Sequence, residues 1–586
     1  MPFLFKKNKL RAKNKEIALD EILLDSKNSP GFDKEMFEGR MEFPLSRSAL
    51  KIIAYFFFAA LLVLFLKTFV LEIARGSYYK EKANNNSLKF VFSPPIRGGI
   101  YDRNGAFLVW NELYSFKNAT TVNPVLIELD GETDTNFLRK YDSNAGLSNI
   151  LGFLGIDNNV KKEIDLSIRQ TGFKTGKDGL EKYYNKALSG KPGVKIIEVD
   201  SLGNLVSHNA REQGEAGEKI NLTVDAKVNS KLYELMKDTA KERGFQGGAA
   251  VIMDIKTGEI LALTTVPQYD SAVLSFGLEK SLIQGYLKNE QNPFLNRVVA
   301  GMYAPGSIIK PLIALAALNE GIISPKKVVL TYGSVSVPNP YKPGEYTVFK
   351  DWKNHGEVDM YKALAVSSDA YFYTIGGGNG GIRGLGIDRI KKYAEMFGFN
   401  KKTGIDLFGE VEGVIPDSVL HEKLNPENPV WRIGDTYHAA IGQGNFQVTP
   451  IEMAVYASTL ANKGIILTPR LIKDKKFYGT PSTIEKVKIP EEYFDVVQRG
   501  MRMAVEEGTA HGMADLTIEV AGKTGTAEIG KKYVNSWFIG FWPYQNPRYS
   551  ITVVLERGSP DNLIGGVYVA RQLLGWMQYN TPEYMK

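Results

Sequence analysis

An unbroken apolar run near the N-terminus limits the architectures open to this chain more than any other feature. Residues 52–66 read IIAYFFFAALLVLFL, and residues 69–71 extend the run past Lys67 and Thr68. The run is close to the length that a helix needs to cross a bilayer, about 20 residues. We therefore expect one membrane-spanning helix over residues 49–71.

The two other interpretations of this run are a cleaved signal peptide and a buried core helix. The leader through Lys51 is too long for a signal-peptide n-region, and no A-x-A pattern follows the run. The leader carries 11 basic and 8 acidic residues, although Arg75, Lys80 and Lys82 follow the span. The excess of positive charge predicts that residues 1–48 form a cytoplasmic tail.

Length and composition describe a large globular protein behind this span. The chain has 586 residues, which is too many for one ordinary domain. Its hydrophobic fraction is 44% and its charged fraction is 23%, both globular values. The net charge of +7 includes no long basic run, so we expect no nucleic-acid partner.

The content of cysteine and histidine argues against two classes of site. The chain has no cysteine, which excludes disulfides and zinc held by thiolates. Its five histidines are scattered, with no pair at metal-ligand spacing, so neither a Ser-His-Asp triad nor a zinc enzyme is expected. They are His208, His355, His421, His438 and His511.

Three motifs in a fixed order predict serine acyl transfer. The first supplies a nucleophile with a base one helical turn away, and the later two supply a proton shuttle and a cationic substrate-binding strand. In chain order they are Ser307-Ile-Ile-Lys310, Ser367-Ser368-Asp369 and Lys523-Thr524-Gly525-Thr526.

The first motif is selected by its surroundings, because the pattern alone is common. S-x-x-K also begins at Ser48, Ser77 and Ser324. Before Ser307, however, residues 303–306 (YAPG) break the chain, and residues 308–318 (IIKPLIALAAL) have the composition of a buried helix. Ser307 is therefore expected at a helix N-terminus, where free amides favour developing negative charge.

The third motif is selected in the same way. K-T-G also begins at Lys174, Lys256 and Lys402. The K-T-G motif at Lys256 is best explained as a hairpin turn, because it lies between strand-like residues 249–253 and 260–265. The set at Lys523 precedes two strand-like runs, residues 536–541 and 549–555, so we expect it on the first strand of a closing antiparallel sheet.

Other local signals outline the organisation of the chain. Residues 102–105 (DRNG) predict a hairpin turn, and the polar, glycine-rich residues 209–218 predict a domain boundary. Residues 220–224 are expected to form a strand, followed by a helix with Val228, Leu232, Leu235 and Met236 on one face. Thr449 and Glu452 form a predicted capping box around Pro450.

Several longer stretches together resemble the class B penicillin-binding proteins. They are Arg97 to Gly105 (RGGIYDRNG), Gly179 to Tyr184 (GLEKYY), Leu222 to Asp225 (LTVD), Gly442-Gln443-Gly444 with Thr449-Pro450, and Lys523 to Glu528 (KTGTAE). The resemblance runs from the span to the C-terminus. Asp369 and the upstream Asp351-Trp352-Lys353 are similar to the elongation-type branch of that class.

The resemblance implies an α+β fold on a membrane anchor. Beyond the cytoplasmic tail, residues 1–48, and the transmembrane helix, residues 49–71, it implies an elongated pedestal of the dimerisation type, residues 72–219. A penicillin-binding transpeptidase domain, residues 220–586, would follow, with a five-stranded antiparallel sheet flanked by helices.

The resemblance also implies the reaction and the roles of the motif residues. The family cross-links peptidoglycan stem peptides through an acyl-enzyme on a serine, here Ser307, and beta-lactams acylate the same serine. Lys310 would accept the proton of Ser307, with burial and the charge of Lys523 favouring its neutral form, although the sequence leaves open which lysine is the base. Ser367 would pass the proton to the departing amine.

The remaining residues would bind the substrate. Asp369 would hold the two lysines, and Lys523, Thr524 and Thr526 would bind the substrate carboxylate. The amides of Ser307 and Thr526 would form the oxyanion hole. Gly525 would leave room for an acyl group lying along the strand.

The implied partners and cofactors complete the expectation. The pedestal would dock a membrane glycan polymerase of the SEDS type and a rod-complex scaffold protein. Some elongation-type members bind zinc near the active site, but only Asp351 and His355 echo that site, so we expect no metal and no cofactor. The domain would lie on the periplasmic side of the inner membrane.

Other functions stay open on sequence grounds. A serine beta-lactamase or D,D-carboxypeptidase would share the first and third motifs, but no Glu-x-x-Leu-Asn deacylation motif is found. A division-type transpeptidase, a penicillin sensor and a non-catalytic scaffold are the further alternatives. A sensor would need more spans and a cytoplasmic effector.

Overall fold

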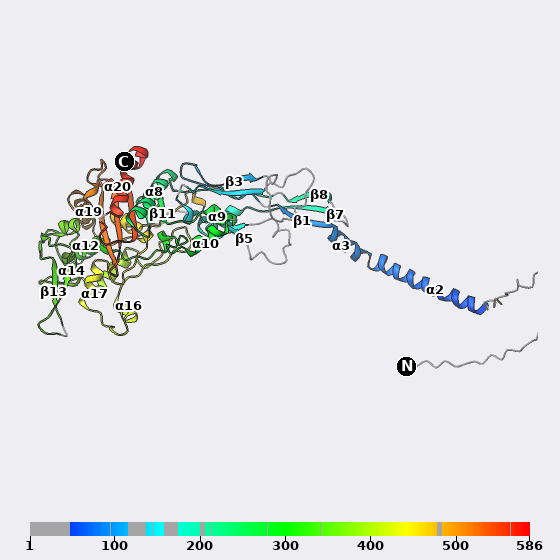
Figure 1. Cartoon of the computed structure of the whole chain (residues 1–586), viewed down its shortest axis with the longest axis horizontal. Helices are drawn as coiled ribbons and strands as arrows, with labels where there is room; N and C mark the ends of the chain where they lie inside the picture. The colour runs from blue at the N-terminus through cyan, green and yellow to red at the C-terminus, as the bar shows by residue number, and fades with distance from the viewer. Residues whose placement is uncertain are drawn as a thin grey trace, which may run out of the picture. The chain divides into compact units, whose positions relative to one another are not determined.

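The computed structural model describes most of the chain beyond the tail, and the chain divides into two compact units, Met1–Ser87 and Leu88–Lys586 (Figure 1). The predicted cytoplasmic tail lies almost entirely outside the described residues. These are residues 47–93, 95–114, 136–143, 146–156, 174–199, 205–212, 214–277, 279–339, 342–477, 483–562 and 564–586.

The first unit contains the predicted membrane helix. Helix α2 (Arg47–Phe69) continues through a π-helical turn, η2 (Val70–Ala74), and is followed by α3 (Gly76–Ser87). No side chain of α2 is buried in the protein. The helix from Arg47 to Ala74 has 28 residues and is long and apolar enough to cross a membrane, since it rises roughly 42 Å against a hydrocarbon core of about 30 Å. It fits a single-pass membrane anchor.

The second unit begins with a three-stranded antiparallel sheet in the order β1-β7-β8. Its strands are β1 (Leu88–Ser93), β7 (Gly193–Val199) and β8 (Leu205–Glu212). Strand β8 includes the first residues of the polar segment 209–218, so part of the expected boundary is a strand.

A four-stranded sheet follows, in the order β4-β3-β2-β9. Strands β2 and β3 are antiparallel and enclose the turn at residues 102–105, which confirms the predicted hairpin. The strand expected over residues 220–224 is shorter, because the amide of Thr223 donates to the carbonyl of Leu471 and the chain leaves the sheet. The strands are β2 (Ile100–Tyr101), β3 (Phe107–Tyr114), β4 (Asn136–Tyr141) and β9 (Ile220–Asn221).

A buried ionic cluster joins two of the stretches that carry the family resemblance. The carboxylate of Glu181, in α6 (Gly179–Tyr183), accepts hydrogen bonds from Arg97 Nε at 2.6 Å and from Arg139 Nε at 2.8 Å. Glu181 is fully buried, and burial alone would raise its pKa, but the two guanidinium groups hold that pKa below the usual value. The cluster therefore has a structural role in the pedestal.

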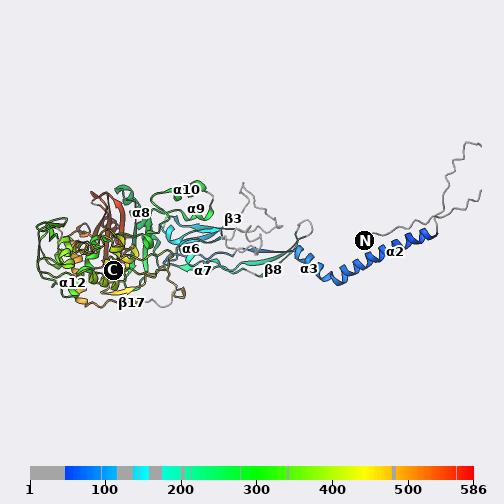
Figure 2. The ribbon, with the colours of Figure 1, turned by 90° about the horizontal axis from the view of Figure 1, so that it is seen from below.

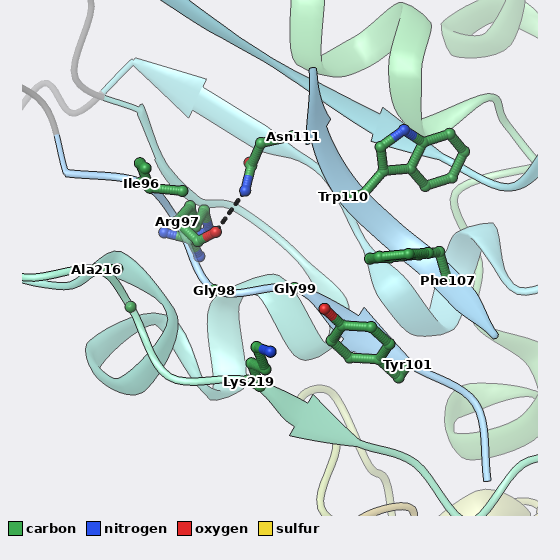
Figure 3. A pocket seen from close by; sticks show the side chains of 11 residues that line it. Ile96, Arg97, Gly98, Gly99, Tyr101, Phe107, Trp110, Asn111, Ala216 and Lys219 are labelled. Carbon is green, nitrogen blue, oxygen red and sulfur yellow. Dashed lines mark hydrogen bonds between the residues drawn. The ribbon is translucent and has the colours of Figure 1, made fainter. Parts of the chain in front are cut away.

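A hollow of about 290 Å³ opens beside the Arg97–Gly99 segment (Figure 3). Three aromatic side chains, Tyr101, Phe107 and Trp110, line it, with Lys219 at its lower edge in the view. None of its lining residues belongs to the three motifs, so this hollow is separate from the candidate active site.

The core of the second unit is a five-stranded antiparallel sheet in the order β11-β10-β20-β19-β18. The Lys256 motif lies in the turn between β10 and β11, and the Lys523 motif lies in edge strand β18, as predicted from the sequence. The strands are β10 (Gly247–Asp254), β11 (Ile260–Val266), β18 (Ala521–Ile529), β19 (Tyr533–Trp542) and β20 (Tyr549–Gly558).

Helices cover both faces of this sheet, which explains the unbroken apolar sequence of its central strands. In β10, Val251 packs in the cluster that holds α12 (Lys310–Asn319) and α18 (Pro450–Ala461), whereas Ile252 packs in the opposite cluster. The opposite cluster contains α8 (Ala226–Arg243) and α20 (Gly566–Asn580). Helix α8 lies beside the sheet in both views (Figure 1, Figure 2). Successive side chains of a strand point to opposite faces, so both sets are apolar.

Two helices begin as their sequences predict. Asp225 caps α8 by accepting hydrogen bonds from the amides of Lys227 and Val228. The capping box at the start of α18 is present, with Thr449 and Glu452 each accepting from the other's backbone amide. Such caps stabilise a helix by about 1 kcal/mol.

Candidate active site

Ser307 lies in a tight turn that precedes a buried helix. The turn is a 3-10 segment, η5 (Gly306–Ile309), and α12 starts only at Lys310, slightly later than predicted. Gly306 has a φ of +57°, and its amide donates to the carbonyl of Gly442 at 2.9 Å. A Cβ on Gly442 would lie 2.3 Å from Gly306 O, so this close approach requires glycine. The serine itself is half-buried.

Lys310 connects the first motif to the second. Its side chain is fully buried, and its Nζ donates to the carbonyl of Ser367 at 2.7 Å and to Ser367 Oγ at 3.2 Å. It also forms an ion pair with Asp369 Oδ1 at 2.6 Å. A single ammonium group thus holds both functional side chains of the second motif.

The second motif is a sharp turn between two helices, α13 (Met360–Val366) and α14 (Asp369–Gly377). Ser367 has a left-handed backbone, with φ +58° and ψ +42°, a rare conformation for a residue with a Cβ. Ser368 caps α14, because its Oγ accepts from the amide of Tyr371. Both serines are buried, whereas Asp369 is partly exposed.

The third motif lies on β18, where its side chains alternate between two environments. Lys523 and Gly525 are buried on the side that packs against η5, whereas Thr526 is exposed and Thr524 is half-buried. Thr524 Oγ1 donates to Thr509 Oγ1 at 2.7 Å. The strand therefore presents its two threonines together, as a substrate-binding strand would.

The two lysines of the motifs lie in different electrostatic surroundings. Burial and the ammonium group of Lys310 hold the pKa of Lys523 well below the lysine range, with Asp369 offsetting part of the effect. Lys523 Nζ donates to the carbonyl of Thr524, at 2.9 Å. Lys310, in contrast, is paired with a carboxylate. The lowered pKa favours a neutral amine at Lys523, and the carboxylate of Asp369 lies against Lys310.

Gly525 also lies close to the turn that carries Ser307. A Cβ on this residue would lie 2.9 Å from Ile308 Cγ2 and 3.0 Å from the carbonyl oxygen of Pro305. Both atoms belong to the turn that carries Ser307, not to the open side of the strand. The missing side chain lets β18 pack against that turn and so brings Ser307 and the third motif together.

We expect Gly525→Ala to slow acylation of Ser307 by about tenfold, because an added methyl must push the η5 turn away from β18, at a cost of about 1–3 kcal/mol. Rates of covalent labelling and melting temperatures would measure both effects. Gly512→Ala is the matched control, since its Cβ would meet nothing within 4 Å. Unchanged labelling of Gly525→Ala would show that the turn tolerates the displacement.

Asp351 and His355 were the only residues expected to echo a metal site. Asp351 is fully buried and lies 3.6 Å from His355 Nε2, while burial lowers the pKa of His355. Asp351 Oδ2 already accepts from Ser368 Oγ and from the amide of Ala370. Among the described residues, no group of three or more His, Asp or Glu side chains could hold a metal ion.

The bonds from Asp351 to the second motif were not foreseen. They link residues 17 and 19 positions apart in the sequence. Local patterns reveal partners one helical turn apart, whereas this contact depends on how a loop folds back. The only local signal for this contact was an aspartate next to an aromatic residue, Asp351-Trp352.

The assembled site has the groups that acyl transfer needs. Ser307 is a hydroxyl at the start of a helix, next to a fully buried lysine and a strained serine that the lysine bonds. A second lysine of lowered pKa can hold a proton, and the threonines of β18 can bind a carboxylate. No histidine or metal is needed for this chemistry.

Two family models match the chain. Residues 248–572 match the penicillin binding protein transpeptidase domain, and these residues are more than half of the chain. Residues 115–222 match the penicillin-binding protein dimerisation domain. The two matched segments contain all three motifs and the pedestal strands β7 and β8, respectively.

Individual proteins are similar over nearly the whole length. The peptidoglycan D,D-transpeptidase MrdA of Haemophilus influenzae is 28% identical over 89% of this chain and 92% of its own. The crystal structure of Pseudomonas aeruginosa PBP2 in complex with WCK 5153 has 28% identity and a TM-score of 0.66, covering 85% of this chain and 98% of that one. The structure of the complex between Helicobacter pylori PBP2 and MreC has 26% identity and a TM-score of 0.68, covering 84% and 99%.

Proposed function

The chain belongs to the family of penicillin-binding proteins with a transpeptidase domain, and we infer that it is an elongation-type peptidoglycan D,D-transpeptidase. It is a serine acyltransferase that cross-links stem peptides, and beta-lactams are its inhibitors. Relatives named MrdA and PBP2, similar over most of the chain, support the elongation type. The observation that carries the conclusion is the convergence of Lys310, Ser367 and Lys523 in the buried region that follows the Ser307 turn.

For the acylation step, we propose that Ser307 Oγ attacks the carbonyl carbon of the penultimate D-Ala. Lys310 takes the proton of Ser307 after passing one of its own through Ser367 to Lys523. The 3.2 Å contact between Lys310 Nζ and Ser367 Oγ supports the first part of this relay. The lowered pKa of Lys523 supports the transfer from Ser367 to Lys523, because a neutral amine can accept a proton.

The negative charges of substrate and intermediate need separate partners. The amides of Ser307 and Thr526 would stabilise the oxyanion, an effect worth about 3 kcal/mol per donor. The hydroxyls of Thr524 and Thr526, with Lys523 once it is protonated, would bind the terminal carboxylate. Asp369 would keep Lys310 in place throughout, as its 2.6 Å ion pair suggests.

The reaction closes by transfer to a second stem. The C–N bond to the terminal D-Ala breaks as its amine takes a proton through Ser367, which leaves an ester on Ser307. An acceptor amine then attacks the ester, Ser307 recovers its proton, and a peptide cross-link remains. Gly525 lets the strand and the Ser307 turn stay packed through both steps.

The function is tested with the full chain in detergent, supplied with glycan polymer that carries pentapeptide stems. We expect cross-linked muropeptides and released D-Ala, and both should disappear after penicillin is added. Rapid turnover of penicillin without cross-linking would instead identify a beta-lactamase. In cells, depletion should reduce cross-links and turn rods into round cells, whereas filaments would indicate a division enzyme.

The acylation rate should depend on pH through Lys523. A lysine can accept a proton only as the neutral amine, which predominates above its pKa. The acylation rate should therefore rise as the pH passes the lowered pKa of Lys523. The rate should reach its plateau at a pH below the ordinary lysine pKa of about 10.4. Rapid-mixing measurements with penicillin would record the profile. Lys523→Arg should lose the rising limb, and a limb centred at the ordinary value would contradict the relay.

We propose partners that fit an anchored enzyme acting on a fixed polymer. A rod-complex scaffold protein and a membrane glycan polymerase of the SEDS type would dock on the pedestal, residues 72–219, leaving the transpeptidase domain, residues 220–586, free to reach stems. The similar Helicobacter pylori protein was solved with MreC, which supports the scaffold partner.

The proposed orientation places the tail in the cytoplasm and the second unit in the periplasm, with α2 in the inner membrane. Because the chain lacks cysteine, a variant with one introduced cysteine can be labelled only at that residue. In intact spheroplasts, a membrane-impermeant maleimide should label Lys531→Cys, which replaces an exposed residue, but not Ser26→Cys in the tail. The reverse pattern would refute the orientation.

A further inference from the structure

Asp351 occupies a position between a surface hairpin and the second motif. It follows β14 (Tyr346–Lys350), which pairs with β13 (Ser334–Pro338). Its amide donates to the carbonyl of Gly333 at 2.9 Å, and its side chain is fully buried. The base of the hairpin therefore holds this carboxylate firmly against α14.

Both oxygens of that carboxylate accept hydrogen bonds. Oδ2 accepts from Ser368 Oγ at 2.8 Å and from the amide of Ala370 at 3.0 Å. Oδ1 accepts from the amide of Trp352 at 2.8 Å. An asparagine could not replace it, because in either orientation its NH₂ group would face a donor.

The residues bonded by Asp351 flank the strained backbone of the second motif. Ser367 keeps its left-handed conformation only if its surroundings hold it there. Lys310 holds it from one side through its carbonyl and Oγ. Asp351 holds the other side, since Ser368 follows Ser367 directly and Ala370 is the second residue of α14. Released from either side, the turn can relax and move Ser367 Oγ away from Lys310.

We propose that Asp351 is a positioning residue for acylation: it bridges Ser368 and Ala370 and thereby aims Ser367 at Lys310. This role deepens the proposed function and rests on it. Asp351 touches no reacting atom, so it should affect the rate of the covalent step and leave binding of the beta-lactam nearly unchanged. A purely structural role would instead lower the melting temperature and leave the covalent step intact.

The test uses the full chain in detergent and a fluorescent penicillin, with the dissociation constant and the first-order acylation constant measured separately. For Asp351→Asn we expect the acylation constant to fall roughly 100-fold, the loss that a misplacement of about 1 Å can cause. The dissociation constant should change less than about threefold, because no contact with the ligand is lost.

Asp254→Asn is the matched control. Asp254 is also a buried carboxylate that accepts two backbone amides, those of Lys256 and Thr257, but it lies in the β10–β11 turn. This variant should lower the melting temperature without changing the acylation constant. If Asp351→Asn behaves like Asp254→Asn, the positioning role is wrong.

Ser368→Ala keeps the proposal testable if Asp351→Asn does not fold. It removes the donor to Asp351 and the acceptor that caps the Tyr371 amide but keeps the bond from Ala370 to Asp351, so the acylation constant should fall about tenfold, the value of one buried hydrogen bond. The double variant should be no slower than Asp351→Asn, because both act through one bond. Wild-type rates for either single variant, or fully additive losses, would overturn the role. Labelling of Ser307→Ala would instead overturn the proposed function itself.

Discussion

Ser307→Ala is expected to abolish covalent labelling by fluorescent penicillin. The Ser307 hydroxyl lies in the turn before α12, whereas the hydroxyls of Ser367 and Ser368 are buried, the first bonded to Lys310 and the second to the amide of Tyr371. Loss of a serine nucleophile lowers turnover by on the order of a millionfold in a comparable hydrolase. In-gel fluorescence of the full chain after incubation with the label would measure the result.

Ser324→Ala is the control that the sequence itself offers. Ser324 begins one of the other S-x-x-K patterns, Ser324 to Lys327, but its carbonyl closes a turn with the amide of Lys327. This variant should label as the wild type does. If Ser307→Ala labels fully, the nucleophile is misassigned, and normal cross-linking in cells that contain only this variant would favour the scaffold function.

Lys310→Ala should have the second largest effect, because one side chain supports three groups of the site. The variant leaves Asp369 without its partner and frees both the carbonyl and the Oγ of Ser367. Acylation should slow by on the order of a thousandfold or more, as expected when a proton-transfer group is lost. Breaking a buried ion pair should also destabilise the protein by about 3–5 kcal/mol.

Lys391→Ala is the matched control for the loss of an ion pair. Lys391 Nζ lies 2.6 Å from Asp417 Oδ2, the same separation as in the Lys310–Asp369 pair, but at the surface. Its loss should cost about 0–1 kcal/mol and should leave acylation unchanged. Denaturation and rapid-mixing labelling of both variants would separate the two effects. Equal rates in the two variants would exclude a catalytic role for Lys310.

Local sequence was sufficient for much of the fold. The hairpin at Lys256, the two strands that follow the Lys523 motif and the capping box at the start of α18 were all predicted, because neighbouring residues determine turns, caps and apolar periodicity. Strand 220–224 was predicted too long. Its backbone bonds to the 471–472 segment, about 250 residues away, and local pattern carries no information about such a partner.

The members of the candidate site stay a prediction from the sequence, and the contacts among them were not foreseen. Ser307 and Lys523 were distinguished from identical motifs by their placement at a helix start and on a strand. The charge of each lysine was not predictable, because it depends on which of them meets Asp369 and how deeply each is buried.

The sequence by itself determined that this chain has one apolar span, three ordered motifs and the residues of a class B penicillin-binding protein. These features depend on residue types and on short spacings along the sequence, which can be identified without knowing the fold. Only the tertiary structure decided that burial lowers the pKa of Lys523, that Gly525 packs against the Ser307 turn, and that Asp351 bonds Ser368. Each of these depends on a contact between distant segments, and burial and hydrogen bonding arise only when the folded chain brings those segments together.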